Sequence, residues 1–153
     1  MHDPEVVARV GRAWRELRRG AAWQALRPLL YGEGPDALDL GQIDALDLLA
    51  EQDGRRMSEL ADALRVDAST ATRAVDRLVA DGFVTREMAS DDRRAVVVRL
   101  TPEGRTRHRA LAERRRGVIQ RIVADFEESE LVHLAELLER MVAAVDRVVS
   151  ETP

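Results

Sequence analysis

Apolar residues recur at helical spacing over most of this chain, and residues 4–30 form the first such stretch. One face of the predicted helix carries Val6, Val10, Trp14, Leu17 and Ala21. Pro4 suits the first helical turn, whereas Pro28 is expected to end or kink the helix. A connector rich in Gly, Pro and Asp follows at residues 31–41, and a short amphipathic helix is predicted at residues 42–52.

A pair of short helices, joined by the turn RVD, is the clearest local pattern in the chain. The first helix is predicted to begin near Ser58, a good N-cap, and the second covers residues 68–80 behind the cap Asp67. The apolar positions that would face inward are Leu60, Ala61, Leu64, Ala71, Ala74, Val75 and Leu78. Two short helices with this connection are typical of a helix-turn-helix.

A β-hairpin is predicted directly after the second helix. Gly82 lies at a C-cap position, and β-rich runs at residues 83–88 and 95–100 flank the turn sequence ASDDRR. The two aspartates favour the turn, since Asp side chains bond to nearby backbone groups. A hairpin in this place would be the wing of a winged helix-turn-helix.

Two longer helices are predicted after the hairpin. Thr101 is expected to cap the first, with Pro102 at its first position, and this helix should run to about residue 125. The last helix carries an apolar seam with alternating spacings of three and four. The seam consists of Leu131, Leu134, Leu138, Met141, Val145 and Val148. Such a seam usually needs a partner helix, from the same chain or from a second copy.

Charge is distributed unevenly along the 153 residues. The net charge of −4 argues by itself against a nucleic-acid partner. Residues 33–53 hold seven acids and no base, and residues 125–153 hold eight acids and two bases. Residues 9–27 and 105–116, in contrast, each hold six arginines and one acid. The chain is therefore a patchwork in which a basic surface can exist despite the overall charge.

The outward face of residues 68–80 has the chemistry of a major-groove reader. It carries Ser69, Thr70, Thr72, Arg73 and Arg77. Short hydroxyls fit close to base edges, and arginine can pair bidentately with guanine. At the hairpin tip, Arg93 and Arg94 could reach phosphates or a narrow minor groove. The alternatives are surface ion pairs for the helix arginines, for example with Asp76 or Asp81, and a solvated turn for the tip.

Several chemistries are not indicated. The absence of cysteine excludes disulfides and thiolate zinc sites, and the three isolated histidines predict neither a metal nor a cofactor. No nucleophile elbow, phosphate loop or catalytic triad motif is present, so an enzyme is not expected. No apolar run is long enough to span a membrane, and the first ten residues lack a signal pattern, which predicts a cytoplasmic protein.

The ordered set STATRAVDRLVADGFVTRE followed by DDRRAVVVRLTPEGR resembles the MarR family of bacterial transcription regulators over residues 40–105. The resemblance implies a mainly α fold with a small two-stranded β-wing: a winged helix-turn-helix flanked by N- and C-terminal dimerisation helices. In this single domain of residues 1–153, residues 40–101 would bind DNA. The helices at residues 4–30 and 102–150 would interlock with those of a second copy.

The resemblance also assigns roles to residues. Arg77 matches a family arginine that is structural as much as DNA-facing, and Asp92, Arg93 and Arg94 match the family's Asp-Arg-Arg wing. The family often has an effector pocket between its dimer helices and its winged part, which Trp14, Arg18 and Tyr31 could line.

The predicted function is therefore a homodimeric, sequence-specific regulator that represses nearby genes. It would bind a pseudo-palindromic double-stranded DNA operator, and a small phenolic, aromatic or drug-like effector would release it. The alternative from another class is a winged-helix protein-interaction module that does not read DNA.

Overall fold

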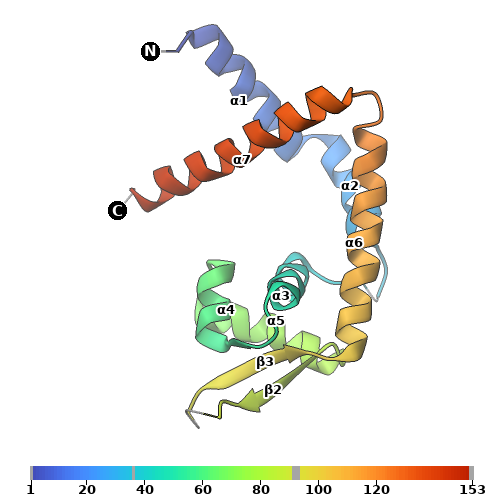
Figure 1. Ribbon diagram of the computed structural model, residues 1–153, viewed down its shortest axis with the longest axis vertical. Helices are drawn as coiled ribbons and strands as arrows, with labels where there is room; N and C mark the ends of the chain where they lie inside the picture. The colour runs from blue at the N-terminus through green and yellow to red at the C-terminus, as the bar shows by residue number, and fades with distance from the viewer. Residues whose placement is uncertain (1, 36, 91–93, 152–153) are drawn as a thin grey trace. The chain divides into compact units, whose positions relative to one another are not determined.

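The computed structural model describes residues 2–35, 37–90 and 94–151 (Figure 1). The chain is mostly helical with one small antiparallel sheet, and it divides into compact units at residues 1–115 and 116–153, which are described separately. Its elements are α1 (Pro4–Arg19), α2 (Ala21–Tyr31), α3 (Leu40–Glu51), β1 (Arg55–Arg56), α4 (Met57–Leu64), α5 (Ala68–Ala80), β2 (Val84–Met88), β3 (Val96–Leu100), α6 (Pro102–Ile122) and α7 (Glu128–Ser150).

The first predicted helix is two helices, broken at Gly20. Gly20 is extended (φ −60°, ψ 148°), and its N–H donates to the Glu16 carbonyl at 2.7 Å. A Cβ at this position would lie 2.6 Å from the same carbonyl oxygen, so the close approach requires glycine. Pro28 does not end α2, which continues to Tyr31. A proline removes only one backbone donor, and the N–H of Gly32 still bonds to the Pro28 carbonyl at 2.8 Å.

The core lies among α3, α4, α5 and the sheet. Its most completely buried large side chains are Ile43, Leu46, Leu49, Leu60, Val75, Leu78 and Val98. A reciprocal cap starts α3: Asp39 accepts from the N–H of Gln42 at 2.9 Å, and Gln42 accepts from the N–H of Asp39 at 3.0 Å. The helical spacing predicted at residues 42–52 and 68–80 therefore describes two faces that meet in one core.

The start of α4 differs from the prediction. The helix begins at Met57 with Arg56 at the N-cap position, so Ser58 lies inside its first turn. The reason is Glu59, whose carboxylate accepts from the N–H of Arg56 at 3.1 Å and so satisfies a donor one residue before Met57. The helix ends at Leu64, and Arg65 caps it in the left-handed conformation (φ 56°), a place more often taken by glycine.

The predicted hairpin is present, and a third strand joins it. β2 and β3 pair antiparallel in the register Val84 with Leu100 and Met88 with Val96, as Figure 1 shows below α4 and α5. β1 pairs with the other edge of β3, which gives the order β1-β3-β2. The two arginines of β1 carry no alternating pattern, and pairing with the distant β3 makes them a strand.

Thr101 starts α6 as predicted and also attaches it to the hairpin. Its hydroxyl accepts from the N–H of Gly104 at 3.0 Å and donates to the Gly82 carbonyl at 2.7 Å. A Cβ at Gly104 would lie 1.9 Å from the carbonyl oxygen of Phe83. Only glycine allows this approach, so the base of the hairpin and the first turn of α6 are in direct contact.

In α7, which the structure describes throughout, no residue is buried. Of the predicted seam, Leu131, Leu134 and Met141 are partly buried. The other three members, Leu138, Val145 and Val148, are exposed. The helical pattern is confirmed, and the partner expected for the seam stays a prediction.

Candidate nucleic-acid interface

The two faces of α5 separate as the spacing predicts. The inward set of Ala71, Ala74, Val75 and Leu78 is buried. The predicted DNA-reading set points the other way: Ser69, Thr72, Arg73 and Arg77 are exposed, and Thr70 is partly buried. This polar face is available to a partner, whereas the opposite face holds the helix against the core.

Asp67 caps α5 and also engages its hydroxyls. Its carboxylate accepts from the Thr70 N–H at 2.9 Å, from the Thr70 hydroxyl at 2.7 Å and from the Ser69 hydroxyl. These bonds favour the ionised form and hold the pKa of Asp67 far below its usual range, with the hydroxyl bonds of Ser69 and Thr70 the largest causes. The N-cap predicted from the sequence is confirmed, and the carboxylate remains charged at any physiological pH.

Arg73 is held loosely by its own helix. Its Nη2 donates to the Thr70 hydroxyl at 3.3 Å, and its Nε donates to the Ser69 carbonyl at 3.4 Å. Both distances are at the long end for hydrogen bonds, so the bonds are weak. They orient the guanidinium group but leave it able to bind another acceptor. Arg73 can therefore exchange these contacts for stronger ones to a base or a phosphate.

Arg77 has a different environment. It forms an ion pair with Asp39, the N-cap of α3, instead of the Asp76 or Asp81 partner considered from the sequence. Asp81 instead accepts from the buried Gln42 amide at 3.2 Å. The contact ties α5 to the start of α3, which agrees with a partly structural role for Arg77.

Arg86 connects the hairpin to α5, and the sequence reasoning missed it. From β2, its Nη1 contacts a carboxylate oxygen of Asp76 at 2.5 Å, and its Nη2 donates to the Thr72 carbonyl at 3.3 Å. An arginine in a strand, ten positions from an outward acid on the preceding helix, was the available signal. The pair fixes the hairpin against the helix that carries the predicted reading residues.

The wing has charged sides as well as a charged tip. Arg99 on β3 lies 3.4 Å from Glu87 of β2 and 3.6 Å from Asp53 in the turn before β1, so two nearby carboxylates balance its charge. Arg94 is exposed next to the tip. Arg93 and the two aspartates before it lie outside the described residues, and the predicted contact of Arg93 with DNA stays a prediction.

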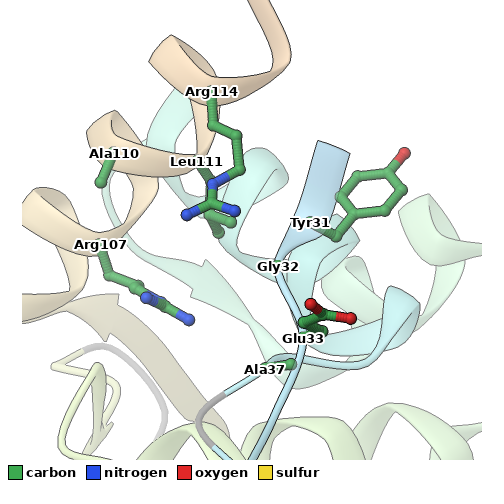
Figure 2. Close-up of a pocket in the computed structure, with 8 residues that line it drawn as sticks. All are labelled: Tyr31, Gly32, Glu33, Ala37, Arg107, Ala110, Leu111 and Arg114. Atoms are coloured by element: carbon green, nitrogen blue, oxygen red, sulfur yellow. The ribbon is translucent and has the colours of Figure 1, made fainter. Parts of the chain in front are cut away.

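A cavity of about 380 Å³ lies between α6 and the segment after α2 (Figure 2). Arg107 and Arg114 extend into it from α6, and Tyr31, Gly32, Glu33 and Ala37 line the opposite side. The positive φ of Gly32 (84°) lets the chain turn there. Of the three pocket residues predicted, Tyr31 lines this cavity. Trp14 and Arg18 are exposed on α1, and their pocket role stays a prediction.

Asp47 joins α3 to α6 through charged contacts. It accepts two bonds from Arg115, at 2.6 and 2.7 Å, and lies 3.0 Å from His108 Nε2. The bonds to Asp47 raise the pKa of Arg115, which stays charged. Burial, together with the nearby charge of Asp47, raises the pKa of Asp44. His108 is therefore part of an electrostatic cluster with Asp47 and Arg115.

Neither a metal site nor a membrane span is found in the described ranges. No cluster of three or more His, Cys, Asp or Glu side chains is placed to hold a metal ion in residues 2–35, 37–90 and 94–151. Within the same ranges, every helix is too short or too polar to cross a lipid bilayer.

Comparison with known proteins adds an independent line of evidence. The MarR family profile matches residues 38–96. The transcriptional repressor MdtR of Bacillus subtilis is 24% identical over 132 residues, which are 86% of this chain and 85% of that protein. Other curated relatives align over smaller shares of their length, such as 66% and 48%.

Solved structures resemble most of the chain. A MarR transcriptional regulator from Methanosarcina mazei has a TM-score of 0.71 at 26% identity, over 91% of this chain and 97% of that one. BpsR of Bordetella bronchiseptica, whose DNA binding is regulated by 6-hydroxynicotinic acid, has a TM-score of 0.66 at 27% identity, over 88% and 98% of the two chains. The chain is thus similar to these regulators in both the winged part and the flanking helices.

Proposed function

Because this chain belongs to the MarR family of DNA-binding transcription regulators, we propose that it is a homodimeric, sequence-specific repressor of nearby genes. The observation that carries the proposal is the outer face of α5. There, hydroxyls and Arg73 stand exposed, and Arg86 holds the hairpin alongside. That combination suits a helix in the major groove with a wing on the adjacent backbone. A protein that acts on the chromosome would work in the cytoplasm.

The proposed dimer accounts for apolar residues that the single chain leaves in water. On α1, Val6, Val10, Trp14 and Leu17 are each about half exposed or more, and α7 exposes half of its seam. Exposed apolar surface of this extent is typical of an interface. The helices at residues 4–30 and 102–150 would therefore dimerise, and the winged part at residues 40–101 would bind DNA.

A symmetric dimer restricts the form of the operator. Two recognition helices about 34 Å apart would enter successive major grooves on one face of the duplex. The operator should then be a pseudo-palindrome. Arginines that neutralise phosphates release counterions, so affinity should fall steeply with salt.

Effector control is the second part of the proposal. The cavity of about 380 Å³ presents two guanidinium groups, from Arg107 and Arg114, and Tyr31 and Glu33 line its opposite side. Such a lining suits a small aromatic carboxylic acid, since guanidinium groups pair with carboxylates. Regulation of BpsR by 6-hydroxynicotinic acid supports the same ligand class. An acid that binds more tightly to a DNA-incompetent state would release the operator.

Fluorescence anisotropy tests the proposed function. The full chain is titrated against DNA from directly upstream of its own gene, with a scrambled duplex as control, over a series of salt concentrations. Tight binding to the upstream DNA alone, with a steep salt dependence, is the expected result. If the operator lies elsewhere in the genome, selection of bound sequences from a randomised duplex library would identify it. A chain that selects no sequence would instead support the alternative, a winged-helix protein-interaction module.

The effector proposal has its own measurement. We expect 6-hydroxynicotinic acid, or a phenolic acid of similar size, to raise the melting temperature and to weaken operator binding. Arg114→Met should abolish both effects while operator binding without the acid is unchanged. A melting temperature that no small aromatic acid shifts would contradict effector control and leave the DNA-binding proposal intact.

A further inference from the structure

The hydroxyls of Ser69 and Thr70, at the start of α5, have a fixed direction of hydrogen bonding. An ionised carboxylate only accepts hydrogen bonds, so the bonds from Ser69 and Thr70 to Asp67 use the single proton of each hydroxyl. The side-chain oxygens of these two residues therefore present only lone pairs to anything that approaches α5. The low pKa of Asp67 keeps this arrangement constant over the physiological pH range.

Thr70 also takes part in holding Arg73. Its oxygen donates to Asp67 at 2.7 Å and accepts from Arg73 Nη2 at 3.3 Å. A hydroxyl oxygen has two lone pairs, so one remains after the bond from Arg73. Arg73 thus donates to Thr70, and Thr70 donates to the charged carboxylate of Asp67.

The edges of bases differ in what they offer to such an oxygen. In the major groove, adenine and cytosine present amino donors, whereas guanine and thymine present carbonyl acceptors. An oxygen that can only accept pairs with the amino groups and is repelled by the carbonyls. We propose that Asp67 is a specificity-determining residue: it fixes Ser69 and Thr70 as acceptors, so that they select adenine or cytosine at the bases they face. This inference rests on the proposed DNA-binding function.

The two carboxylate oxygens of Asp67 have separate tasks, which makes the proposal testable. Oδ1 accepts from the Thr70 N–H and the Ser69 hydroxyl, and Oδ2 accepts from the Thr70 hydroxyl. In Asp67→Asn, the side-chain amide oxygen should take the position of Oδ1, where it still accepts from the Thr70 N–H, because asparagine is a good N-cap. The amide nitrogen then replaces Oδ2 and donates to Thr70, so the Thr70 proton turns outward.

The variant should therefore change a preference instead of removing it. We select bound sequences for the full-length wild type and for Asp67→Asn from one randomised duplex library. At one base pair per half-site, the variant should prefer guanine or thymine where the wild type prefers adenine or cytosine. The ratio between the two classes should change by about tenfold, as one hydrogen bond to a base edge does. The position read by Ser69 should keep its preference.

Two control variants separate this effect from charge and from folding. Asp62→Asn removes one exposed acid from α4 without touching the hydroxyls, and it should change affinity for all sequences alike. Thr70→Val removes the hydroxyl, and in its background the further change Asp67→Asn should leave the base preference as it is. Equal melting temperatures of Asp67→Asn and wild type would show that the cap is retained.

The outcomes distinguish this inference from the proposed function. A wild type that selects a sequence and an Asp67→Asn variant that selects the same one would overturn the assignment of Asp67 alone. The same holds if the preference changes equally in the Thr70→Val background. A wild type without any preference would overturn the proposed function, and this inference with it.

Discussion

Two regions of the molecule have similar amphipathic patterns but differ in how far their apolar faces are buried. One is the segment from α3 to the first half of α6, and the other consists of the helices α1 and α7. In the first region, the apolar faces meet one another, and Leu46 and Leu78 are fully buried. In α1 and α7, the apolar faces stay in water, with Trp14 49% and Leu138 52% exposed. An apolar stripe therefore predicts that a surface will be covered, but not by what. The apolar faces of the first region cover one another, whereas those of α1 and α7 stay exposed and are the faces that the proposed dimer would bury.

The strongest way to test this contrast is to truncate one leucine in each region. Leu46→Ala should lower the free energy of unfolding by about 2–5 kcal/mol, because it leaves a cavity in a closed core. Chemical denaturation at fixed protein concentration measures the loss. Leu138→Ala is the matched control and should change the midpoint mainly through its dependence on protein concentration. Equal, concentration-independent losses for both would contradict the contrast.

A charged substitution tests the partner directly. Leu138→Glu should weaken self-association by about 2 kcal/mol or more, the scale of a central interface residue, because a carboxylate would have to be buried. Sedimentation equilibrium measures the dissociation constant. Arg140→Gln, an exposed polar position on the same helix, should leave it unchanged. A Leu138→Glu protein that sediments as the wild type does would show that this part of α7 lies outside the interface.

DNA reading should be separable from both regions. Arg73→Ala should cost about 1–3 kcal/mol in operator binding and relax the preference at one base pair, with folding and dimerisation intact. Arg77→Ala should instead lower stability as well as affinity, because it breaks the contact with Asp39. Anisotropy on operator and scrambled DNA, combined with thermal melting, measures both. If Arg73→Ala weakened both duplexes equally, Arg73 would contact phosphate instead of a base.

The smallest expected effect is on stability and comes from the carboxyl group of Asp44, on α3. The pKa of Asp44 is raised by burial and by Asp47, so its charged form destabilises the fold above the window where the folded carboxyl titrates. Asp44→Asn should therefore stabilise the protein at neutral pH, within about 0.5 kcal/mol as is usual at a surface. The gain should vanish as pH falls below the normal range of an aspartate. Melting curves across pH measure it, and a gain that persists at low pH would point to a cause other than charge.

Local spacing was enough for part of this molecule. The inward and outward faces of α5, the caps Asp67 and Thr101 and the hairpin depend on residues within a few positions of one another. The sequence could therefore place Ser69, Thr72, Arg73 and Arg77 on the exposed face of α5, with Thr70 partly buried beside them. It failed at Gly20, where a close backbone contact with Glu16 breaks the helix, and at Met57, where the Glu59 carboxylate moves the helix start.

The amino-acid sequence by itself determined most of the helical segments, which face of α5 is polar, and that the terminal helices carry apolar stripes. Only the tertiary structure decided that Arg77 pairs with Asp39, that Arg86 holds α5 through Asp76, that Asp47 joins Arg115 and that β1 completes the sheet. The physical reason is range. Helical periodicity and capping act within one or two turns, whereas the partner of a charged side chain or an edge strand is chosen by which distant segments the core brings together.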